Sequence, residues 1–300
     1  MPILFALVGP TAIGKTELSL RLAEALGAEV LCMDSRQVYR GFRIGTAQPT
    51  TADRARVKHH LTDFLEPEER FSAGSFLKRT KEILALNPGK NFLLVGGTGL
   101  YLKALTEGLP EIPEISSKVK AQLRELYEGE GLAKCCRLAR ALDPEAMETI
   151  RDTDTQRILR VIEVFWASGR KLSEWHGERT GGLGPLPTFF LEQERAGLYE
   201  KIDRRTEAMF KAGWPEEAEV LSQKVPPSAP AWNSLGYREI LKFLSGELSK
   251  TACLELVQRE TRHFAKRQIT WFKHQTPARQ IDVSAFTAAE IFDRLLKKFG

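Results

Sequence analysis

A glycine-rich segment near the amino terminus has the residue types and spacing of a phosphate-binding loop. Residues 9–16, GPTAIGKT, fit the pattern GxxxxGK[ST], and they lie between an apolar run at 3–8 and a helical pattern. Glycines let successive backbone N–H groups face phosphate oxygens, and the start of a helix adds partial positive charge. Lys15 can reach a terminal phosphate, and the Thr16 hydroxyl can bind Mg²⁺. The candidate phosphate-binding residues are Gly9, Pro10, Thr11, Ala12, Ile13, Gly14, Lys15 and Thr16.

A second feature is the absence of the usual partner of such a loop. Nucleotide hydrolases and kinases commonly add an apolar strand that ends in an Asp, which holds the metal ion. Here the apolar run at 92–95 ends in Gly96-Gly97, whereas the run at 29–33 leads into Asp34. Asp34 is therefore either a metal ligand or a group with another role. The loop predicts a bound phosphate without identifying it as ATP.

Alternating apolar runs and helical patterns predict an α/β fold with a P-loop parallel-sheet core. Leucines four residues apart, from Leu18 to Leu26, predict a helix directly after the loop, and a second helical pattern covers 76–86. The predicted strands are 3–8, 29–33, 92–95 and 189–192.

The pattern changes after Pro110. From Ser116 to about Trp175 it is helical, with no strand-like run. We therefore predict a helical insertion domain at 112–185 within a discontinuous core. That core comprises residues 1–111 and 186–300, and its carboxyl-terminal part is predicted to be mostly helical over 198–223 and 235–273.

Composition and charge placement limit the class of protein. With 42% hydrophobic and 28% charged residues, the 300-residue chain has the composition of a globular protein. No run approaches the roughly 20 apolar residues of a membrane span. Because the start lacks a basic signal region, we expect a cytoplasmic protein with reduced cysteines. The segment 259–279 holds six Lys or Arg and one Glu, which equals the whole net charge of +5 and suits a polyanionic partner.

Several sequence blocks, in order along nearly the whole chain, resemble the bacterial tRNA dimethylallyltransferase family. The blocks are GPTAIGKT, DSRQVYRGFRIGTAQP (34–49), HHLTDFLEP (59–67), VGGTGLYLKAL (95–105), DTDTQRILRVIEV (152–164), SLGYREI (234–240) and RHFAKRQITWF (262–272). Members transfer a dimethylallyl group from dimethylallyl diphosphate to N6 of the adenosine next to the tRNA anticodon, position 37. The resemblance implies that the loop binds the donor diphosphate with Mg²⁺, which accounts for the missing metal-holding strand.

The resemblance also implies three catalytic residues. Asp34 matches the general base, which would remove the N6 proton as the new bond forms. Thr98 matches a threonine that contacts the diphosphate. Arg205 matches an arginine that neutralises the leaving diphosphate, with the adjacent Arg204 as the alternative.

Contacts to tRNA are implied at two places. Ser35, Arg36 and Gln37 follow the base and are expected to meet the target nucleotide, together with Asp34 itself. The insertion is expected to hold the anticodon stem through Lys120, Gln156, Arg157, Ile158, Leu159 and Arg160. In the late helix, helical spacing places Arg259, Arg262, His263 and Lys266 on a basic face and Val257, Phe264 and Trp271 on an apolar stripe.

Some residues depart from the family pattern, and other functions stay open. Ile13 replaces a serine of the loop, RDTD at 151–154 replaces a commoner Pro-Asn-Asp, and Trp214 replaces a leucine. Related enzymes prenylate free AMP or ADP, P-loop kinases phosphorylate small metabolites, and a nucleotide-gated RNA-binding module would form no product. The helical insertion and the basic late helix favour tRNA, and we expect a monomer with no membrane partner. The adenine is expected to leave its stack and to enter a tunnel opposite the donor.

Overall fold

The computed structural model describes residues 3–298, apart from the side chain of His176. The chain divides into two units, which are described separately. Unit 1 comprises Met1–Lys103 and Pro185–Gly300, and unit 2 comprises Ala104–Gly184. The division falls within helix α4 (Gly99–Glu107), whereas the sequence pattern places the start of the insertion at 112.

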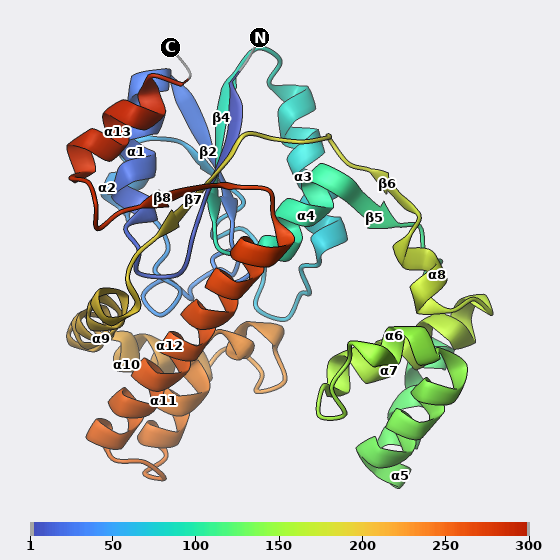
Figure 1. Cartoon of the computed structure of the whole chain (residues 1–300). Coiled ribbons are helices and arrows are strands. Elements are labelled where there is room, and N and C mark those ends of the chain that lie inside the picture. Colours follow the sequence, from blue (N-terminus) through green and yellow to red (C-terminus); the bar gives the residue numbers. More distant parts are fainter. Residues whose placement is uncertain (1–2, 299–300) are drawn as a thin grey trace. The chain divides into compact units, whose positions relative to one another are not determined.

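Within residues 3–298, unit 1 is built on a six-stranded parallel sheet of order β3-β2-β4-β1-β7-β8 (Figure 1). The strands are β1 (Leu4–Val8), β2 (Ala28–Met33), β3 (His59–His60), β4 (Asn91–Gly96), β7 (Thr188–Glu192) and β8 (Arg279–Asp282). Each strand predicted from an apolar run is confirmed, as is the α/β class. These runs are apolar throughout because helices cover both faces of a parallel sheet.

The register of the central strands brings three loops together. Val8 at the end of β1 pairs with Gly96 of β4, and Met33 at the end of β2 pairs with the same glycine. The segments that follow β1, β2 and β4 therefore leave the sheet at one level. In α/β proteins the ligand site lies at this carboxyl edge.

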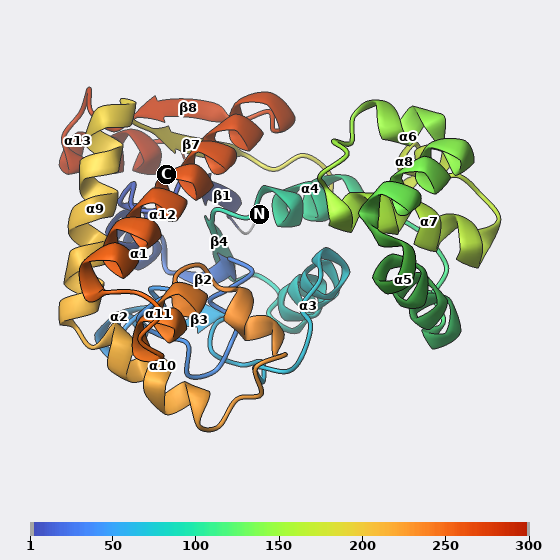
Figure 2. The ribbon, with the colours of Figure 1, turned by 90° about the horizontal axis from the view of Figure 1, so that it is seen from below.

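Helices lie on both sides of the sheet in unit 1 (Figures 1 and 2). Helices α1 (Lys15–Leu26) and α13 (Ala288–Leu296) pack together on one side, and α3 (Ala73–Leu86) lies on the other. The short α2 (Thr51–Arg56) begins with a capping box between Thr50 and Asp53.

A group of helices lies beyond the carboxyl ends of the strands (Figure 1). It comprises α9 (Arg195–Lys211), α10 (Trp214–Ser222), the 3₁₀ helix η1 (Pro230–Asn233), α11 (Tyr237–Leu244) and α12 (Lys250–Gln275). Its core is aromatic: the ring of Phe42 lies 5.1 Å from that of Trp232 and 4.8 Å from that of Tyr237. Since Phe42 belongs to the segment after β2, this core fixes that segment against the helices.

The sequence pattern missed the short strands. Strand β3 has only two residues, and β8 has the polar sequence RQID at the opposite edge of the sheet. In unit 2, β5 (Gly108–Pro110) and β6 (Arg179–Gly181) form an antiparallel pair. None of these segments contains an apolar run, so periodicity could not identify them.

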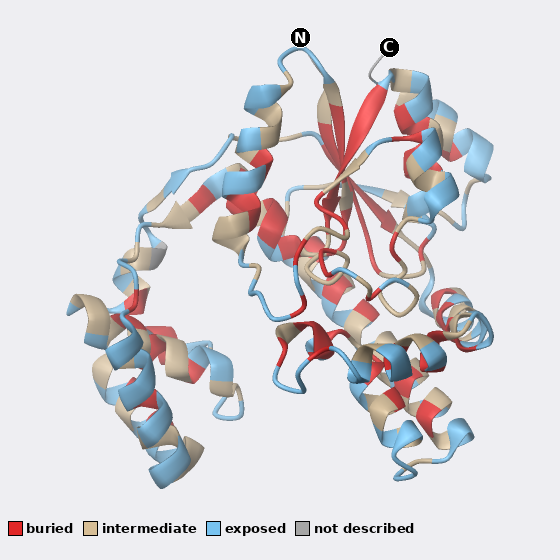
Figure 3. Cartoon of the chain, turned by 180° about the vertical axis from the view of Figure 1, so that it is seen from behind, coloured by how far each residue is buried: buried red, intermediate tan, exposed pale blue. Residues whose placement is uncertain are grey.

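Unit 2 is otherwise helical, as predicted. Its helices are α5 (Ser117–Leu142), α6 (Pro144–Glu148), α7 (Thr155–Ser168) and α8 (Leu172–His176). Helix α5 is interrupted at Gly131, where φ is +75°. Figure 3 shows buried residues in the helices of this unit, and Ile158, Val161 and Ile162 of α7 are fully buried in its core.

The four cysteines are not joined in disulfides, and the helices are not of the kind that crosses a membrane, within the described residues. Cys32, Cys135, Cys136 and Cys253 are buried and carry free thiols. Over residues 3–298, none of the helices combines the length and the apolar character that a membrane crossing requires.

Candidate active site

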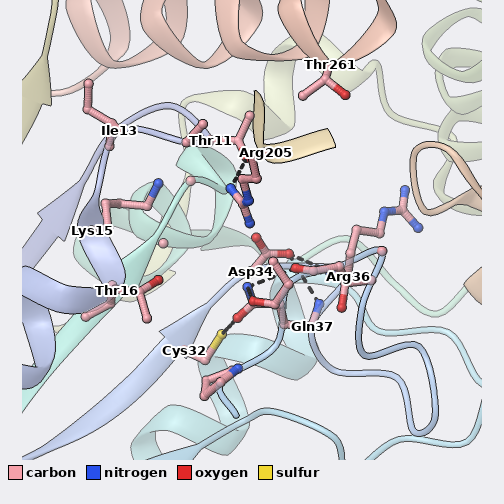
Figure 4. Close-up of a pocket in the computed structure, with 18 of the residues that line it drawn as sticks. Thr11, Ile13, Lys15, Thr16, Cys32, Asp34, Arg36, Gln37, Arg205 and Thr261 are labelled. Atoms are coloured by element: carbon pink, nitrogen blue, oxygen red, sulfur yellow. Dashed lines mark hydrogen bonds between the residues drawn. The ribbon is translucent and has the colours of Figure 1, made fainter. Parts of the chain in front are cut away.

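A pocket of about 520 Å³ lies in unit 1 where the three loops converge (Figure 4). Its wall includes the phosphate-binding loop, the segment after β2 and the turn after β4. Helices α9 and α12 complete it. The residues that line the pocket include Thr11, Ala12, Ile13, Gly14, Lys15, Thr16, Cys32, Asp34, Arg36, Gln37, Gly97, Arg205, Met209, Phe264 and Gln268.

The phosphate-binding loop has the expected backbone. Gly14 has φ +99°, a left-handed conformation that favours glycine, and it is the residue from which α1 begins. The side chain of Ile13 is buried in the core of unit 1, so only its backbone is available to a ligand. Thr16 is exposed and lines the pocket, where its hydroxyl is accessible. Gly9 and Pro10 do not line the pocket, and Pro10 has no N–H to donate.

Lys15 is held by its own loop. Its Nζ donates to the carbonyl oxygens of Gly9, at 2.9 Å, and Pro10, at 2.7 Å. Burial, and to a lesser extent the positive charge of Arg205, lower the pKa of Lys15 to about 7, although the negative charge of Asp34 acts in the opposite direction. Near neutral pH the ammonium is therefore easily deprotonated, and added negative charge in the pocket would stabilise it.

Asp34 is fixed at the end of β2 by its own turn. Its Oδ1 accepts hydrogen bonds from the backbone N–H groups of Arg36, at 2.8 Å, and Gln37, at 3.3 Å. The carboxylate and the Arg205 guanidinium point toward one another in Figure 4. Among the described residues there is no group of three or more His, Cys, Asp or Glu side chains that could hold a metal ion.

The structure distinguishes Arg205 from Arg204. Arg205 lines the pocket and its Nη1 donates to Thr11 Oγ1 at 3.1 Å. Burial lowers the pKa of the Arg205 guanidinium, and Asp34 opposes that shift. Arg204 is exposed and pairs with Glu200 at 2.9 Å. Arg205 is therefore the arginine of the two that faces the pocket.

Thr98 and Ser35 lie beside the pocket and bind each other. The Thr98 hydroxyl accepts a hydrogen bond from the Ser35 N–H at 3.2 Å, and neither residue is part of the pocket wall. In this structure Thr98 joins the turn after β4 to the segment that carries Asp34. A contact between Thr98 and the diphosphate stays a prediction.

Gln37 and Arg36 both line the pocket, and the side-chain amide of Gln37 is hydrogen-bonded within the pocket wall. The Gln37 amide donates to the carbonyls of Thr46, at 3.1 Å, and Ala47, at 2.9 Å, and accepts from the Cys32 thiol at 3.1 Å. Burial raises the pKa of that thiol, which keeps it protonated and able to donate. Gln37 therefore shapes the wall through bonds that a nucleotide contact would have to replace.

Sequence reasoning missed several residues of the wall. Met209 and Phe264 supply an apolar surface from α9 and α12. Gln268 of α12 accepts a hydrogen bond from the Thr11 N–H at 2.8 Å, so that this N–H is already engaged. The block RHFAKRQITWF marked α12, but its periodicity indicated only a basic face and an apolar stripe.

In unit 2, the residues assigned to the tRNA stem have different surroundings. Lys120, Gln156 and Arg157 are exposed, and Arg157 lies 3.4 Å from Asp154. Arg160 is partly buried and pairs with Glu163 at 2.7 Å, and Leu159 packs partly buried against the core. The side chain of Ile158 is fully buried on the apolar face of α7, so only its backbone could meet tRNA, and a contact there stays a prediction.

The predicted basic face of α12 is only partly available. Arg262 donates to Asp203 of α9 at 2.6 Å and therefore joins two helices. Arg259 and His263 both lie close to Glu260, whereas Lys266 is exposed. On the apolar stripe, Val257 is buried, Trp271 is partly buried and Phe264 lines the pocket.

These groups could hold a polyanion next to a carboxylate that accepts a proton. Backbone N–H groups, Lys15 and Arg205 supply positive charge on one side of the pocket, and Asp34 can accept a proton on the other. The apolar wall between α9 and α12 suits a hydrocarbon group.

Comparison with known proteins identifies the family. The family model described as IPP transferase matches residues 37–275. A tRNA dimethylallyltransferase from Trichlorobacter lovleyi is 39% identical over 284 residues, 93% of each chain. The crystal structure of a tRNA delta(2)-isopentenylpyrophosphate transferase from Staphylococcus epidermidis is 30% identical, with a TM-score of 0.71, and covers 100% of this chain and 99% of its own.

A eukaryotic dimethylallyltransferase acting on tRNA has the same fold. Its TM-score is 0.81 over 99% of this chain and 78% of its own, at 23% identity. The matching family model spans well over half of the sequence, and the identity with the Trichlorobacter relative extends over nearly all of it. This chain belongs to the IPP transferase family.

Proposed function

We propose that the protein is a tRNA dimethylallyltransferase. It transfers a dimethylallyl group from dimethylallyl diphosphate to N6 of the adenosine at position 37 of tRNA and releases diphosphate. The observation that carries the proposal is the joint placement of the phosphate-binding loop, Arg205 and Asp34 around one pocket with an apolar wall. It acts as a monomer in the cytoplasm on the anticodon stem-loop.

The pocket residues account for each bond change. N6 attacks C1 of the allylic group, the bond between C1 and the bridging oxygen breaks, and the N6 proton moves to the Asp34 carboxylate. The leaving diphosphate carries away the bonding electrons, and its charge is stabilised by the loop N–H groups, Lys15 and Arg205. The N6 lone pair is delocalised into the purine ring, which makes N6 a weak nucleophile. A carboxylate such as Asp34 that removes the N6 proton as the new bond forms makes N6 a better nucleophile.

The residues present also fit a magnesium ion. Mg²⁺ is usually held by one or two protein oxygens together with substrate phosphates and water. The Thr16 hydroxyl is exposed on the pocket wall, and we propose that it binds the ion with diphosphate oxygens. When bound, Mg²⁺ supplies additional stabilisation of the negative charge on the diphosphate.

A tRNA acceptor is favoured over a free nucleotide by unit 2. This unit has its own core and displays Lys120, Gln156 and Arg157 at its surface, features that AMP or ADP would not require. Exposed cations on a helical unit suit the phosphate backbone of an RNA stem. We therefore propose that unit 2 holds the anticodon stem while unit 1 carries out the chemistry.

The direct test is mass spectrometry of an anticodon stem-loop incubated with the enzyme, dimethylallyl diphosphate and Mg²⁺. We expect one dimethylallyl group to be added at the adenosine that follows the anticodon. Parallel reactions contain AMP or ADP as the acceptor, or ATP in place of the prenyl donor. Prenylated AMP without modified RNA, or phosphoryl transfer from ATP, would contradict the proposal.

Replacing Asp34 tests the general base. Asp34→Asn keeps an oxygen that can accept from the Arg36 and Gln37 N–H groups, so the turn is expected to survive, but it cannot take up the N6 proton. We expect kcat to fall by about 10²-fold or more, with little change in the affinity for either substrate. Asp34→Ala, which removes the turn as well, serves for comparison. A kcat of Asp34→Asn close to that of the wild type would show that Asp34 is not the base.

The low pKa of Lys15 predicts how diphosphate binding depends on pH. In the free enzyme the pKa is about 7, and bound diphosphate raises it, so binding above pH 7 requires proton uptake. The contribution of Lys15 is complete at low pH and decreases as pH rises above 7. Between pH 7 and 8.5 we expect the affinity for inorganic diphosphate to fall by about tenfold more in the wild type than in Lys15→Arg.

Calorimetry in two buffers of different ionisation enthalpy measures this uptake directly. The Lys15→Arg variant corrects for titration of the ligand, because an arginine stays protonated throughout this range. Identical pH dependences in the two proteins would show that Lys15 does not change its protonation on binding.

Arg157 tests the role of unit 2. Arg157→Ala is expected to weaken binding of the stem-loop and to reduce the slope of log K against log salt by about one, as for the loss of one phosphate contact. Diphosphate affinity should not change. Lys134→Ala is the matched control, since Lys134 is also exposed and paired, with Glu130, but lies outside the predicted contact set. Equal slopes for wild type and Arg157→Ala would exclude an ionic contact at this residue.

A further inference from the structure

Gln268 of α12 connects two of the loops that form the pocket. Its Oε1 accepts from the Thr11 N–H at 2.8 Å, and its Nε2 donates to the Gly97 carbonyl at 3.0 Å. The side chain is only 6% exposed. One buried carboxamide thus joins the phosphate-binding loop after β1 to the turn after β4, although 257 residues separate it from Thr11.

The turn after β4 is in turn connected to the segment that carries Asp34. Thr98, the residue after Gly97, accepts a hydrogen bond from the Ser35 N–H at 3.2 Å. The Thr98 N–H also donates to the carbonyl of Met33, the last residue of β2, at 3.3 Å. A path of hydrogen bonds, continued through the peptide bond between Gly97 and Thr98, therefore runs from Thr11 through Gln268 to the residues on either side of Asp34.

The glycines of this turn leave room for α12. A Cβ at Gly97 would lie 2.0 Å from Gln268 Nε2, and a Cβ at Gly99 would lie 2.0 Å from Cδ1 of Trp271. Atoms cannot approach that closely, so each glycine is needed for the contact of one α12 side chain. The close packing of α12 against this turn therefore requires glycine at both positions, and the hydrogen bond from Gln268 to Gly97 depends on that packing.

We propose that Gln268 is a positioning residue for prenyl transfer, an inference that rests on the proposed function. It fixes the phosphate-binding loop relative to the Asp34 segment, and so it sets the separation between the diphosphate and the general base. It also occupies the Thr11 N–H, which leaves the following N–H groups of the loop and the Thr11 hydroxyl, already bonded to Arg205, to face the ligand. Gln268 acts through these residues and has no bond-making role.

The geometry explains why such a bridge matters for rate. Transfer requires N6, C1 and the leaving oxygen to be nearly in line, and small displacements of one reactant cost large factors in rate. The diphosphate is held by the β1 loop and the base by the β2 segment, and these elements are not adjacent strands, since β4 lies between them. Gln268 and Thr98 make the connection across β4.

The test compares Gln268→Met with the wild type. Methionine has a similar shape but forms neither hydrogen bond. We expect the Kd of inorganic diphosphate to rise at least tenfold and kcat to fall at least tenfold per folded molecule, while the Kd of the anticodon stem-loop changes less than twofold. Thr270→Ala is the matched control on α12, because Thr270 is exposed and its hydroxyl donates to the Lys266 carbonyl of the same helix.

A second variant perturbs the bridge from the other side. In Gly97→Ala the new methyl group must displace the Gln268 amide, and we expect the same losses. Adding Gln268→Ala removes that clash, so the double variant should be no worse than Gln268→Ala alone. This variant keeps the inference testable if Gln268→Met fails to fold.

The outcomes separate the two claims. A purely structural role of Gln268 would lower Tm but leave diphosphate affinity and kcat of the folded fraction within threefold of the wild type, and that result would overturn the inference. If the wild type modifies RNA and both variants are unimpaired, the inference alone fails. If the wild type modifies no RNA but its diphosphate affinity depends on Gln268, the proposed function fails and the role in positioning the loop stands.

Discussion

The level at which three neighbouring strands end is the constraint on which the rest of the structure depends. Val8 and Met33 both pair with Gly96, so the loops that follow β1, β2 and β4 begin side by side. A strand advances about 3.3 Å per residue, so a shift of one residue in the register of β2 would displace Asp34 by about that distance relative to the loop after β1. The buried apolar runs fix that register, and the chemistry of the pocket is a consequence of it.

The buried positive charges of the pocket would be compensated by a bound polyanion. Lys15, Arg36 and Arg205 line the pocket together with the carboxylates of Asp34 and Glu17, and burial lowers the pKa of Lys15 and of Arg205. Lys15 is stabilised by two loop carbonyls in the absence of a ligand. A diphosphate offers more negative charge and better acceptors than those carbonyls, so its binding energy includes relief of the penalty for burying two cations.

Much of the fold was predictable because it depends on local patterns. Continuous apolar runs located the central strands, and the loop motif located one wall of the pocket. The edge strand β8 was missed because its polar sequence pairs only through the backbone. The role of Gln268 could not be read from the sequence, since it depends on contacts with residues far away in the chain.

Adjacent residues on a helix can face opposite environments, and a sequence motif does not show which of them faces the pocket. Arg204 and Arg205 differ by about 100° around α9, and only the packing of α9 decides which one meets the ligand. Ile158 was assigned to tRNA as part of a block, although its spacing of four from Ile162 already indicated the buried face of α7. A family block identifies a helix, whereas the helical period must identify which of its residues face outward.

The two sides of the pocket differ in rigidity, and this difference bears on the order of events. The segment after Asp34 is fixed at its start by the Asp34 turn and farther along by Glu217, whose carboxylate accepts from the N–H groups of Arg43, at 3.0 Å, and Ile44, at 2.9 Å. Tyr237 donates to the same carboxylate at 2.6 Å.

On the other side, two of the three N–H donors of the Lys15 ammonium are engaged with carbonyl oxygens, so binding a phosphate through more than one of them requires the exchange of a carbonyl partner. The Asp34 carboxylate is therefore fixed by its own turn, whereas Lys15 would exchange a hydrogen bond when a phosphate binds. In the proposed reaction, binding energy of the diphosphate would be spent on moving one lysine, while the carboxylate proposed as the base is already in place.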